Sequence, residues 1–286
     1  MGMREFSWNI FFPKPHSKKI KTKPDYVLEL ENVNLQFGGL SAISDLSFKI
    51  KHWEIVGLIG PNGAGKTSAF NVISGFYKPT SGKIKFLGKS IEGFKPNEVC
   101  RAGMSRTFQN IRLFGNETVL QNVMIGARVR QKYHWWESLL PFVFTDVISE
   151  DAAEKARALE LLDQLSLDEF ANEKASSLPY GAQRRLEIAR ALATKPQFLL
   201  LDEPAAGMNP QESEELMKFI RRLRDEFHLT ILLIEHDMKV VMNVCDYIHV
   251  LDQGVHIAEG TPDEIKSNPK VIEAYLGAGA AEGSVA

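Results

Sequence analysis

Residues 60–67 read Gly-Pro-Asn-Gly-Ala-Gly-Lys-Thr and constrain the fold more than any other stretch of this chain. They fit the pattern G-x-x-x-x-G-K-[ST] at each fixed position, with an apolar run before them (55–59) and a helix-favouring run after them (68–73). In such a strand–loop–helix unit, glycines let backbone N–H groups turn toward phosphate oxygens, and the helix N-terminus adds partial positive charge. A glycine-rich turn without a ligand would not account for the flanking strand and helix.

Two side chains in this loop have the chemistry that a nucleotide needs. Lys66 can reach the β- and γ-phosphates, and the Thr67 hydroxyl can ligate magnesium. The candidate phosphate-binding residues are Gly60, Pro61, Asn62, Gly63, Ala64, Gly65, Lys66, Thr67 and Ser68.

The bulk composition is that of a globular protein. In 286 residues, 34 Lys and Arg stand against 36 Asp and Glu, and a net charge of −2 argues against a general nucleic-acid binder. Cys100 and Cys245 belong to no metal-ligand spacing and are expected to be reduced thiols. No apolar run approaches the roughly 18 residues of a transmembrane helix.

The first 25 residues are expected to form a disordered extension. Residues 1–24 hold six basic residues and five apolar residues between Phe6 and Phe12, but a single acid, Glu5. Pro13 ends the apolar part, so the segment is a poor signal peptide, and Phe6 stands where a myristoylation signal has Ser or Thr. The alternative is an aromatic and basic segment that lies on an anionic membrane surface.

Three apolar runs end in polar residues: 55–59 ends in the phosphate loop, 198–201 in Asp202-Glu203, and 230–234 in Glu235-His236. Near-continuous apolar strands separated by helical stretches indicate a parallel sheet covered on both faces. Ligands of such sheets gather at the carboxyl ends of the strands. We therefore expect Lys66, Asp202, Glu203 and His236 to converge on one site.

Other segments predict a second layer and an inserted helical part. Residues 26–33 and 46–50 alternate apolar and polar side chains, and 83–87 returns to the same antiparallel layer. Residues 117–165 favour helix, most strongly at 152–162, within a helical insertion at about 110–180. Further helices are expected at 211–227, 262–266 and 269–276, with a disordered tail from Gly277. An apolar patch at 135–144 is either part of the core or a surface that faces a partner or the membrane.

Two further segments reveal a family resemblance. Residues 178–185 read Leu-Pro-Tyr-Gly-Ala-Gln-Arg-Arg, and residues 198–204 read Phe-Leu-Leu-Leu-Asp-Glu-Pro. Kinases and GTPases also have such a phosphate loop. The first of these segments resembles the signature motif of ABC-type ATPases, and the second resembles their Walker B motif. The resemblance covers about residues 26–260. It implies an α/β P-loop NTPase with a central, mostly parallel sheet, an antiparallel β layer and an inserted helical subdomain.

The resemblance also implies roles for single residues, with ATP and Mg²⁺ as cofactors. Phe37 resembles the aromatic that stacks on adenine, and residues 206–209 resemble the D-loop. The implied catalytic residues are Glu203 as the base, the switch residue His236 and the Q-loop residue Gln109. The implied metal ligands are Thr67, Gln109 and Asp202. The residues implied to face a partner's ATP are Pro179, Tyr180, Gly181, Ala182 and Gln183.

The Q-loop, signature and C-terminal sequences look like one subfamily, the ATP-binding subunits of branched-chain amino-acid importers, of the first of their two paralogous types. This implies a place on the cytoplasmic face of the cell membrane, with two permease subunits, a second ATPase subunit and, indirectly, a substrate-binding protein. Subunits for amides or urea, or for lipopolysaccharide export, are similar. A soluble ABC ATPase or a small-molecule kinase is the alternative from another class.

Two positions depart from the general ABC pattern. Pro179 and Tyr180 stand where the signature usually has Ser and Gly, and Asn209 stands where the D-loop usually has Asp. The backbone N–H groups of Gly181 and Ala182, at a predicted helix start, can still bind phosphate. A paralogous partner with an ordinary signature would complete the ATP site of this chain, so we expect an asymmetric pair.

Overall fold

The computed structural model describes residues 24–130 and 144–276, which form two compact units. Within the described residues, one unit comprises 24–109 and 197–276, and the other comprises 110–130 and 144–196. Three of the predicted features lie outside the described residues. They are the N-terminal extension as far as residue 23, the apolar patch as far as residue 143, and the tail from Gly277 onward. In the described part of the chain, no helix combines the length and hydropathy needed to cross a bilayer.

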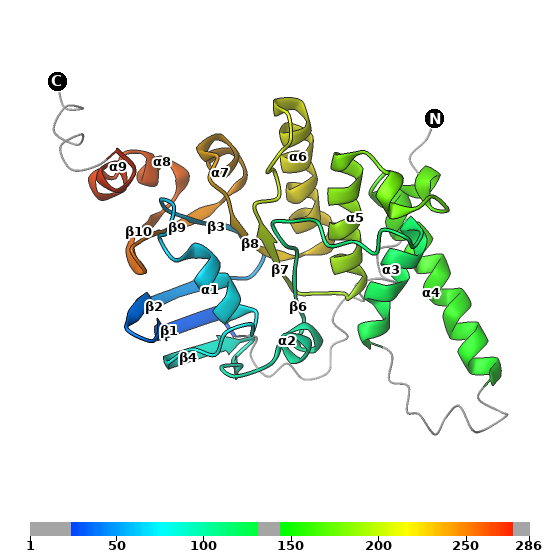
Figure 1. Ribbon diagram of the computed structural model, residues 1–286, viewed down its shortest axis with the longest axis horizontal. Coiled ribbons are helices and arrows are strands. Elements are labelled where there is room, and N and C mark those ends of the chain that lie inside the picture. Colours follow the sequence, from blue (N-terminus) through cyan, green and yellow to red (C-terminus); the bar gives the residue numbers. More distant parts are fainter. Residues whose placement is uncertain (1–23, 131–143, 277–286) are drawn as a thin grey trace. The chain divides into compact units, whose positions relative to one another are not determined.

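A six-stranded sheet organises the first unit (Figure 1). Its order is β10, β9, β3, β8, β7, β6, with β10 antiparallel to β9 and all other neighbours parallel. The bounds are β3 Ile55–Ile59, β6 Met104–Arg106, β7 Phe198–Asp202, β8 Thr230–Ile234, β9 Tyr247–Asp252 and β10 Val255–Gly260. Every residue of β3, β7 and β8 is buried. This confirms the covered parallel sheet that the three apolar runs predict.

A four-stranded antiparallel sheet in the order β2, β1, β4, β5 forms a second layer of the first unit. Its strands are β1 Tyr26–Phe37, β2 Leu40–Lys51, β4 Ser81–Phe86 and β5 Lys89–Ser90. Strands β1 and β2 extend well beyond the predicted 26–33 and 46–50. Their extra length forms a ribbon in which Leu35 and Ile43 pair and are buried. Its tip is exposed, where Gln36 pairs with Ser41 and Phe37 with Leu40.

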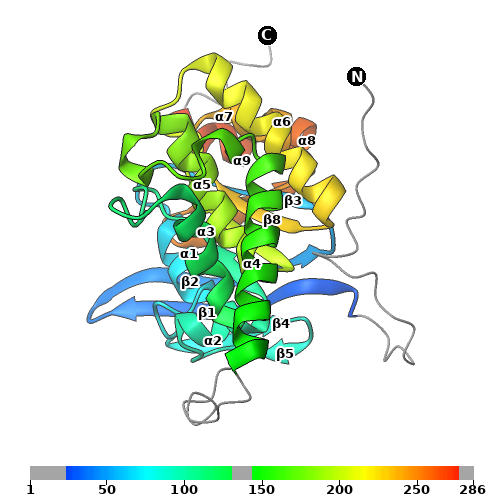
Figure 2. The ribbon, with the colours of Figure 1, turned by 90° about the vertical axis from the view of Figure 1, so that its right-hand side faces the viewer.

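Helices cover the six-stranded sheet on both faces. Figures 1 and 2 show α1 (Lys66–Ile73) on the side of the antiparallel sheet, and α6 to α9 on the opposite side. The remaining bounds are α2 Pro96–Ala102, α6 Pro210–Phe227, α7 Met238–Val244, α8 Pro262–Lys266 and α9 Pro269–Leu276. One buried apolar cluster joins the two sheets through α1 and includes Leu28, Ile50, Leu58 and Phe70. This core fixes the start of α1 against the end of β3.

The second unit is helical within its described residues. Helices α3 (Val119–Ala127), α4 (Phe144–Gln164) and α5 (Tyr180–Ala193) pack against one another (Figure 2). Short 3₁₀ turns occur at Arg128–Arg130, Asp168–Phe170 and Ala175–Ser177. Leu161 and Leu162 of α4 and Leu186 of α5 are buried. The helical prediction for 152–162 is confirmed, because these residues lie within α4.

Six elements of the first unit have no counterpart among the predicted ones: β5, β6, β9, β10, α2 and α7. Strand β6 has three residues, too few to show a period. Strands β9 and β10 carry His249, His256 and Glu259 among their apolar residues, which hides the strand pattern. Their pairing depends on backbone register rather than on a clean apolar alternation.

Candidate functional site

The phosphate loop leaves β3 through Gly60 and enters α1 through Gly65. Both have positive φ, 151° for Gly60 and 94° for Gly65, a region that side chains disfavour. A Cβ on Gly60 would lie 2.1 Å from the carbonyl oxygen of Leu251, so space as well as conformation requires glycine here. Because the first N–H groups of α1 have no partner within the helix, they and the helix dipole form an anion-binding end.

Lys66 closes the loop on itself. Its Nζ donates hydrogen bonds of 2.6 Å to the carbonyl of Gly60 and 2.9 Å to that of Pro61. Burial lowers the pKa of Lys66, while the negative charge of Glu203 acts in the opposite direction. The Lys66 ammonium is partly desolvated, and its hydrogen-bond partners here are neutral carbonyls. A bound phosphate would supply the negative charge that balances it.

Glu203 lies beside the other two predicted catalytic residues, Gln109 and His236. Its Oε2 accepts a 2.7 Å hydrogen bond from Nε2 of Gln109 and lies 3.7 Å from Nδ1 of His236. Strands β7 and β8 are parallel neighbours, with Asp202 paired to Ile234, so their carboxyl ends bring Glu203 and His236 together. Together with the charge interaction between Lys66 and Glu203, this confirms the expected convergence of these strand ends.

The backbone of Glu203 has φ of 45°, in the left-handed region that a non-glycine residue seldom adopts. Its N–H donates a 3.0 Å hydrogen bond to the carbonyl of Ile234, which holds it in this conformation. Strained backbone of this kind, of order 1–3 kcal/mol, clusters at functional sites.

Asp202 has a partner that the sequence analysis does not identify. Its Oδ2 accepts a 2.7 Å hydrogen bond from Arg106, and the two side chains are about 7% exposed. Arg106 also donates to Asn71 at 2.8 Å and Ser74 at 2.9 Å. Its guanidinium lies over three aromatic rings, those of Phe70, Phe76 and Phe108. The sequence signal that could have pointed to Arg106 is its position, three residues before the predicted Q-loop residue Gln109.

The residues predicted to hold a metal have suitable chemistry. Thr67 lies exposed in the first turn of α1, Gln109 precedes the second unit, and Asp202 ends β7. Hydroxyl, amide and carboxylate oxygens are the hard donors that Mg²⁺ prefers. The donor set therefore fits magnesium.

Glu235 is a buried carboxylate behind this site. It accepts hydrogen bonds from the backbone N–H of Ala205 at 2.8 Å and of His236 at 3.3 Å. Burial raises the pKa of Glu235, and these hydrogen bonds oppose the rise. Glu235 thus links the segment after Glu203 to the segment that carries His236.

Phe37 lies at the end of β1, beside the turn at Gly38 and Gly39. Its side chain is 47% exposed, so it does not pack in the core. Its ring contacts that of Tyr77 edge-on, with centroids 5.2 Å apart. These exposed rings offer a surface for stacking on a base.

In the second unit, the predicted signature residues begin α5. Pro179 is its N-cap, and the Pro179 carbonyl accepts the first intrahelical bond, from Gln183 at 3.0 Å. The N–H groups of Tyr180, Gly181 and Ala182 therefore lie in the first turn of α5, as the sequence analysis expects.

A buried ion pair anchors this helix start within the second unit. Arg184, which is fully buried, bonds Glu187 at 3.0 Å and the Tyr180 hydroxyl at 3.2 Å. These contacts give Tyr180 a structural function in the altered signature.

Asn209 of the D-loop is the N-cap of α6. Its side chain accepts from the Glu212 N–H at 2.9 Å, and the Glu212 carboxylate accepts from the Asn209 N–H at 2.9 Å. Asn caps helices as well as Asp does, so the change from the usual residue keeps this function.

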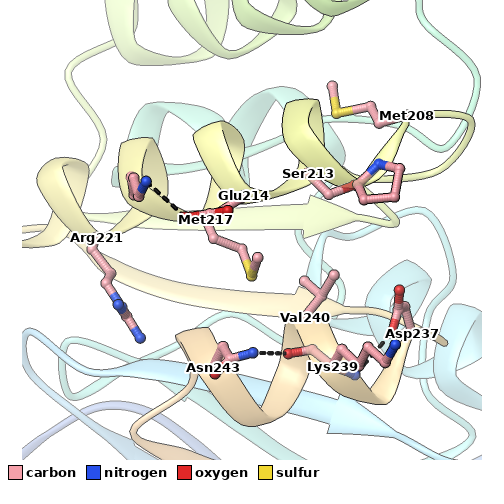
Figure 3. Close-up of a pocket in the computed structure, with 11 residues that line it drawn as sticks. Met208, Ser213, Glu214, Met217, Arg221, Asp237, Lys239, Val240 and Asn243 are labelled. Carbon is pink, nitrogen blue, oxygen red and sulfur yellow. Dashed lines mark hydrogen bonds and ion pairs between the residues drawn. The ribbon is translucent and has the colours of Figure 1, made fainter.

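A groove of about 500 Å³ lies between α6 and α7, next to the D-loop (Figure 3). Met217 of α6 points toward Val240 of α7 across it, and Met208 lies at one end. No residue of the phosphate loop lines it, so it is separate from the candidate nucleotide site.

Comparison with known proteins identifies the family. The family description "ABC transporter" matches residues 43–206, and "Branched-chain amino acid ATP-binding cassette transporter" matches residues 255–281. The chain is 45% identical to the high-affinity branched-chain amino acid transport ATP-binding protein BraF of Pseudomonas aeruginosa over 88% of this chain and 98% of that protein. It is 46% identical to the protein LivG of Escherichia coli, of the same description, with the same coverage.

Solved structures agree with this family. An ATP-binding cassette of an ABC transporter in its ADP conformation has a TM-score of 0.76 and 31% identity, covering 88% of this chain and 99% of that one. A dimeric cassette bound to ADP and Pi has a TM-score of 0.68 and 26% identity, covering 82% and 98%. The chain therefore belongs to the ATP-binding proteins of ABC transporters, whose ATP hydrolysis is coupled to transport.

Proposed function

We propose that this chain is the ATP-hydrolysing subunit of an importer for branched-chain or other hydrophobic amino acids. The observation that carries the proposal is the 45–47% identity, over 98% of the relatives' length, to ATP-binding proteins of high-affinity branched-chain amino acid transport. The match of residues 255–281 to a branched-chain amino acid cassette family supports the same substrate class.

In this proposal, Glu203 is the general base for hydrolysis. Gln109 holds one oxygen of its carboxylate by the 2.7 Å hydrogen bond, and His236 contacts the γ-phosphate and the attacking water. Lys66 and the N–H groups of residues 60–68 bind the phosphates, and Phe37 stacks on adenine. Mg²⁺, held by Thr67, Gln109 and Asp202, would neutralise phosphate charge.

We propose that the chain works in a pair with a paralogous ATPase. In this family arrangement each ATP lies between two cassettes, and the dimeric neighbour bound to ADP and Pi supports pairing. The start of α5, from Pro179 to Gln183, would face the partner's ATP with backbone N–H groups in place of the usual serine hydroxyl.

The remaining partners follow from the importer assignment. The ATPase pair docks onto two permease subunits at the cytoplasmic face of the membrane. Each ATPase uses its helical subdomain and its Q-loop; in this chain these are about residues 110–180, within an ABC domain at 26–260, and the Gln109 loop. A substrate-binding protein delivers the amino acid on the other side. The similar proteins from Pseudomonas aeruginosa and Escherichia coli are named as transport proteins, which supports this placement.

Co-expression of a tagged chain with the genes that flank its own tests this arrangement. We expect purification in detergent to yield one copy of this chain, one copy of a different ATPase and two permease subunits. A complex with two copies of this chain and no second ATPase would contradict the asymmetric pair. Recovery of the chain without membrane proteins would favour a soluble ABC ATPase instead.

A further inference from the structure

Three ligand-type side chains converge on the β9–β10 hairpin, in a place that ATP hydrolysis does not use. Nδ1 of His249 lies 3.1 Å from Oε2 of Glu259 and 3.2 Å from Nε2 of His256, and the last two atoms are 3.8 Å apart. Among the described residues, this is the group of His, Cys, Asp and Glu side chains whose ligand atoms lie close enough to hold a metal ion.

A β-bulge creates this convergence. Glu259 pairs directly with His249 across the hairpin, while His256 pairs with Leu251. The register shifts between His256 and Ala258, so β10 has one extra residue there. In regular strand, residues three apart face opposite sides, but the bulge places His256 and Glu259 on the side of His249.

The distances match a metal centre. Zn²⁺ binds His nitrogen and carboxylate oxygen at about 2.0–2.2 Å, so two ligands of a tetrahedral ion lie about 3.3–3.5 Å apart. The three observed separations, 3.1, 3.2 and 3.8 Å, bracket this value. One proton on Nδ1 of His249 cannot serve both short contacts well, whereas a cation between the three groups satisfies them together.

The surroundings suit this role. His249 is 1% exposed, and its ring packs against Phe48 and Tyr247, with centroids 4.6 and 5.4 Å away. Burial, with a smaller contribution from His256, lowers the pKa of His249 to about 3, and burial also lowers the pKa of His256. Neutral imidazole is the form of histidine that binds metals, and burial favours that form at both rings.

The cluster is also accessible to an ion. Glu259 is about half exposed, and an open groove of about 520 Å³ has both His249 and Glu259 in its lining. A hydrated ion has an entry path through this groove, which leaves room for water as a fourth ligand.

We propose that His249, His256 and Glu259 bind one divalent transition-metal ion, with Zn²⁺ as the fitting ion and water as the fourth ligand. Two imidazoles and a carboxylate favour such ions over Mg²⁺, which prefers all-oxygen sites. The proposed centre is thus chemically distinct from the magnesium ligands Thr67, Gln109 and Asp202.

The ion would brace the hairpin that supports the phosphate loop. In the turn between β9 and β10, the Gly254 N–H donates to the Ala64 carbonyl at 3.0 Å, and the Gly254 carbonyl accepts from the Ser44 N–H at 2.8 Å. A metal that ties β9 to β10 therefore stabilises an element in direct contact with the loop.

Calorimetric titration of the chelator-treated full chain with Zn²⁺, in excess Mg²⁺ and without nucleotide, tests the proposal. We expect one saturable Zn²⁺ site. We expect His256→Gln and Glu259→Gln each to raise the dissociation constant of that site by about 100-fold or more. Loss of a residue that only hydrogen-bonds to a metal ligand typically costs about 10–100-fold. These two residues are chosen because His249 is buried and its replacement could prevent folding. Binding of Co²⁺ should give the intense visible absorption of a tetrahedral centre.

His228→Asn is the matched control, because His228 is exposed and Asn tolerates its left-handed backbone, φ 51°. The control should keep wild-type Zn²⁺ affinity. Zn²⁺ binding that survives both His256→Gln and Glu259→Gln, or no saturable binding at micromolar Zn²⁺, would overturn the proposal. The far-ultraviolet circular dichroism and ATP affinity of each variant show that it is folded.

Discussion

Nε2 of Gln109 donates a 2.7 Å hydrogen bond to Oε2 of Glu203, and Nδ1 of His236 lies 3.7 Å from the same oxygen. Three segments that are far apart in the sequence thus meet at one carboxylate oxygen. Gln109 is also the last residue of the first compact unit before residues 110–196. In the proposed importer, docking of the Gln109 loop to a permease would act on Glu203 through this contact.

Glu203→Gln tests the proposed base. Gln keeps the size of the side chain but cannot take a proton, so ATP turnover should fall by about 10²–10⁴-fold. Binding of MgATP should persist, since the phosphate loop is unchanged. Phosphate release and ATP binding are measured on the same preparation, with Glu226→Gln, near the end of α6, as control. Turnover near the wild-type value would remove Glu203 from this role.

Lys66→Ala should abolish tight ATP binding. The substitution removes the ammonium that bonds the carbonyls of Gly60 and Pro61 and that would neutralise phosphate charge. Calorimetry with ATP measures the effect. An unchanged ATP affinity would contradict the assignment of the phosphate loop.

Arg106→Ala should destabilise the fold by about 3–5 kcal/mol, because it leaves the buried carboxylate of Asp202 without its partner. Arg222→Ala breaks an exposed pair with Glu226 and should cost less than about 1 kcal/mol. Urea unfolding of both variants gives the comparison. Equal losses for the two variants would show that the Arg106–Asp202 pair is not structural.

Glu235 predicts a pH dependence of stability. Its folded pKa is raised above the ordinary value of 4.5, so the folded state binds more protons than the unfolded state as pH rises above 4.5. Its contribution to stability therefore falls as pH rises from 4.5 through the folded pKa. The facing groups are His236, whose positive charge would oppose this, and Glu203, whose negative charge reinforces it.

Glu235→Gln keeps an oxygen acceptor for the Ala205 N–H and removes the titration. The unfolding free energy of this variant, measured against pH, should lack the decline that Glu235 contributes to the wild type. Parallel curves for the two proteins across that range would contradict the prediction.

Much of this fold is predictable from sequence, because its central strands are unbroken apolar runs. Residues 55–59 and 230–234 are predicted with the bounds that β3 and β8 have, and each is followed by residues of the site. Glu203 and His236 meet because they follow the carboxyl ends of β7 and β8, which are adjacent parallel strands.

What the sequence does not predict depends on contacts between distant residues. The Arg106–Asp202 pair joins the edge strand β6 to β7, which no local pattern encodes. The cluster of His249, His256 and Glu259 requires a bulge, and a one-residue change in register would separate its members. Asn209 reads as a departure from a motif, whereas the structure shows a satisfied helix cap.

The most direct test of the central claim is ATP hydrolysis by the reconstituted transporter. The co-expressed complex is placed in liposomes with its binding protein, and phosphate release is measured with and without leucine, isoleucine or valine. We predict that these amino acids raise the rate, and that a complex carrying Glu203→Gln in this chain loses most of the increase. Stimulation by an amide or urea alone would contradict the substrate class, and hydrolysis unaffected by any solute would contradict the importer assignment itself.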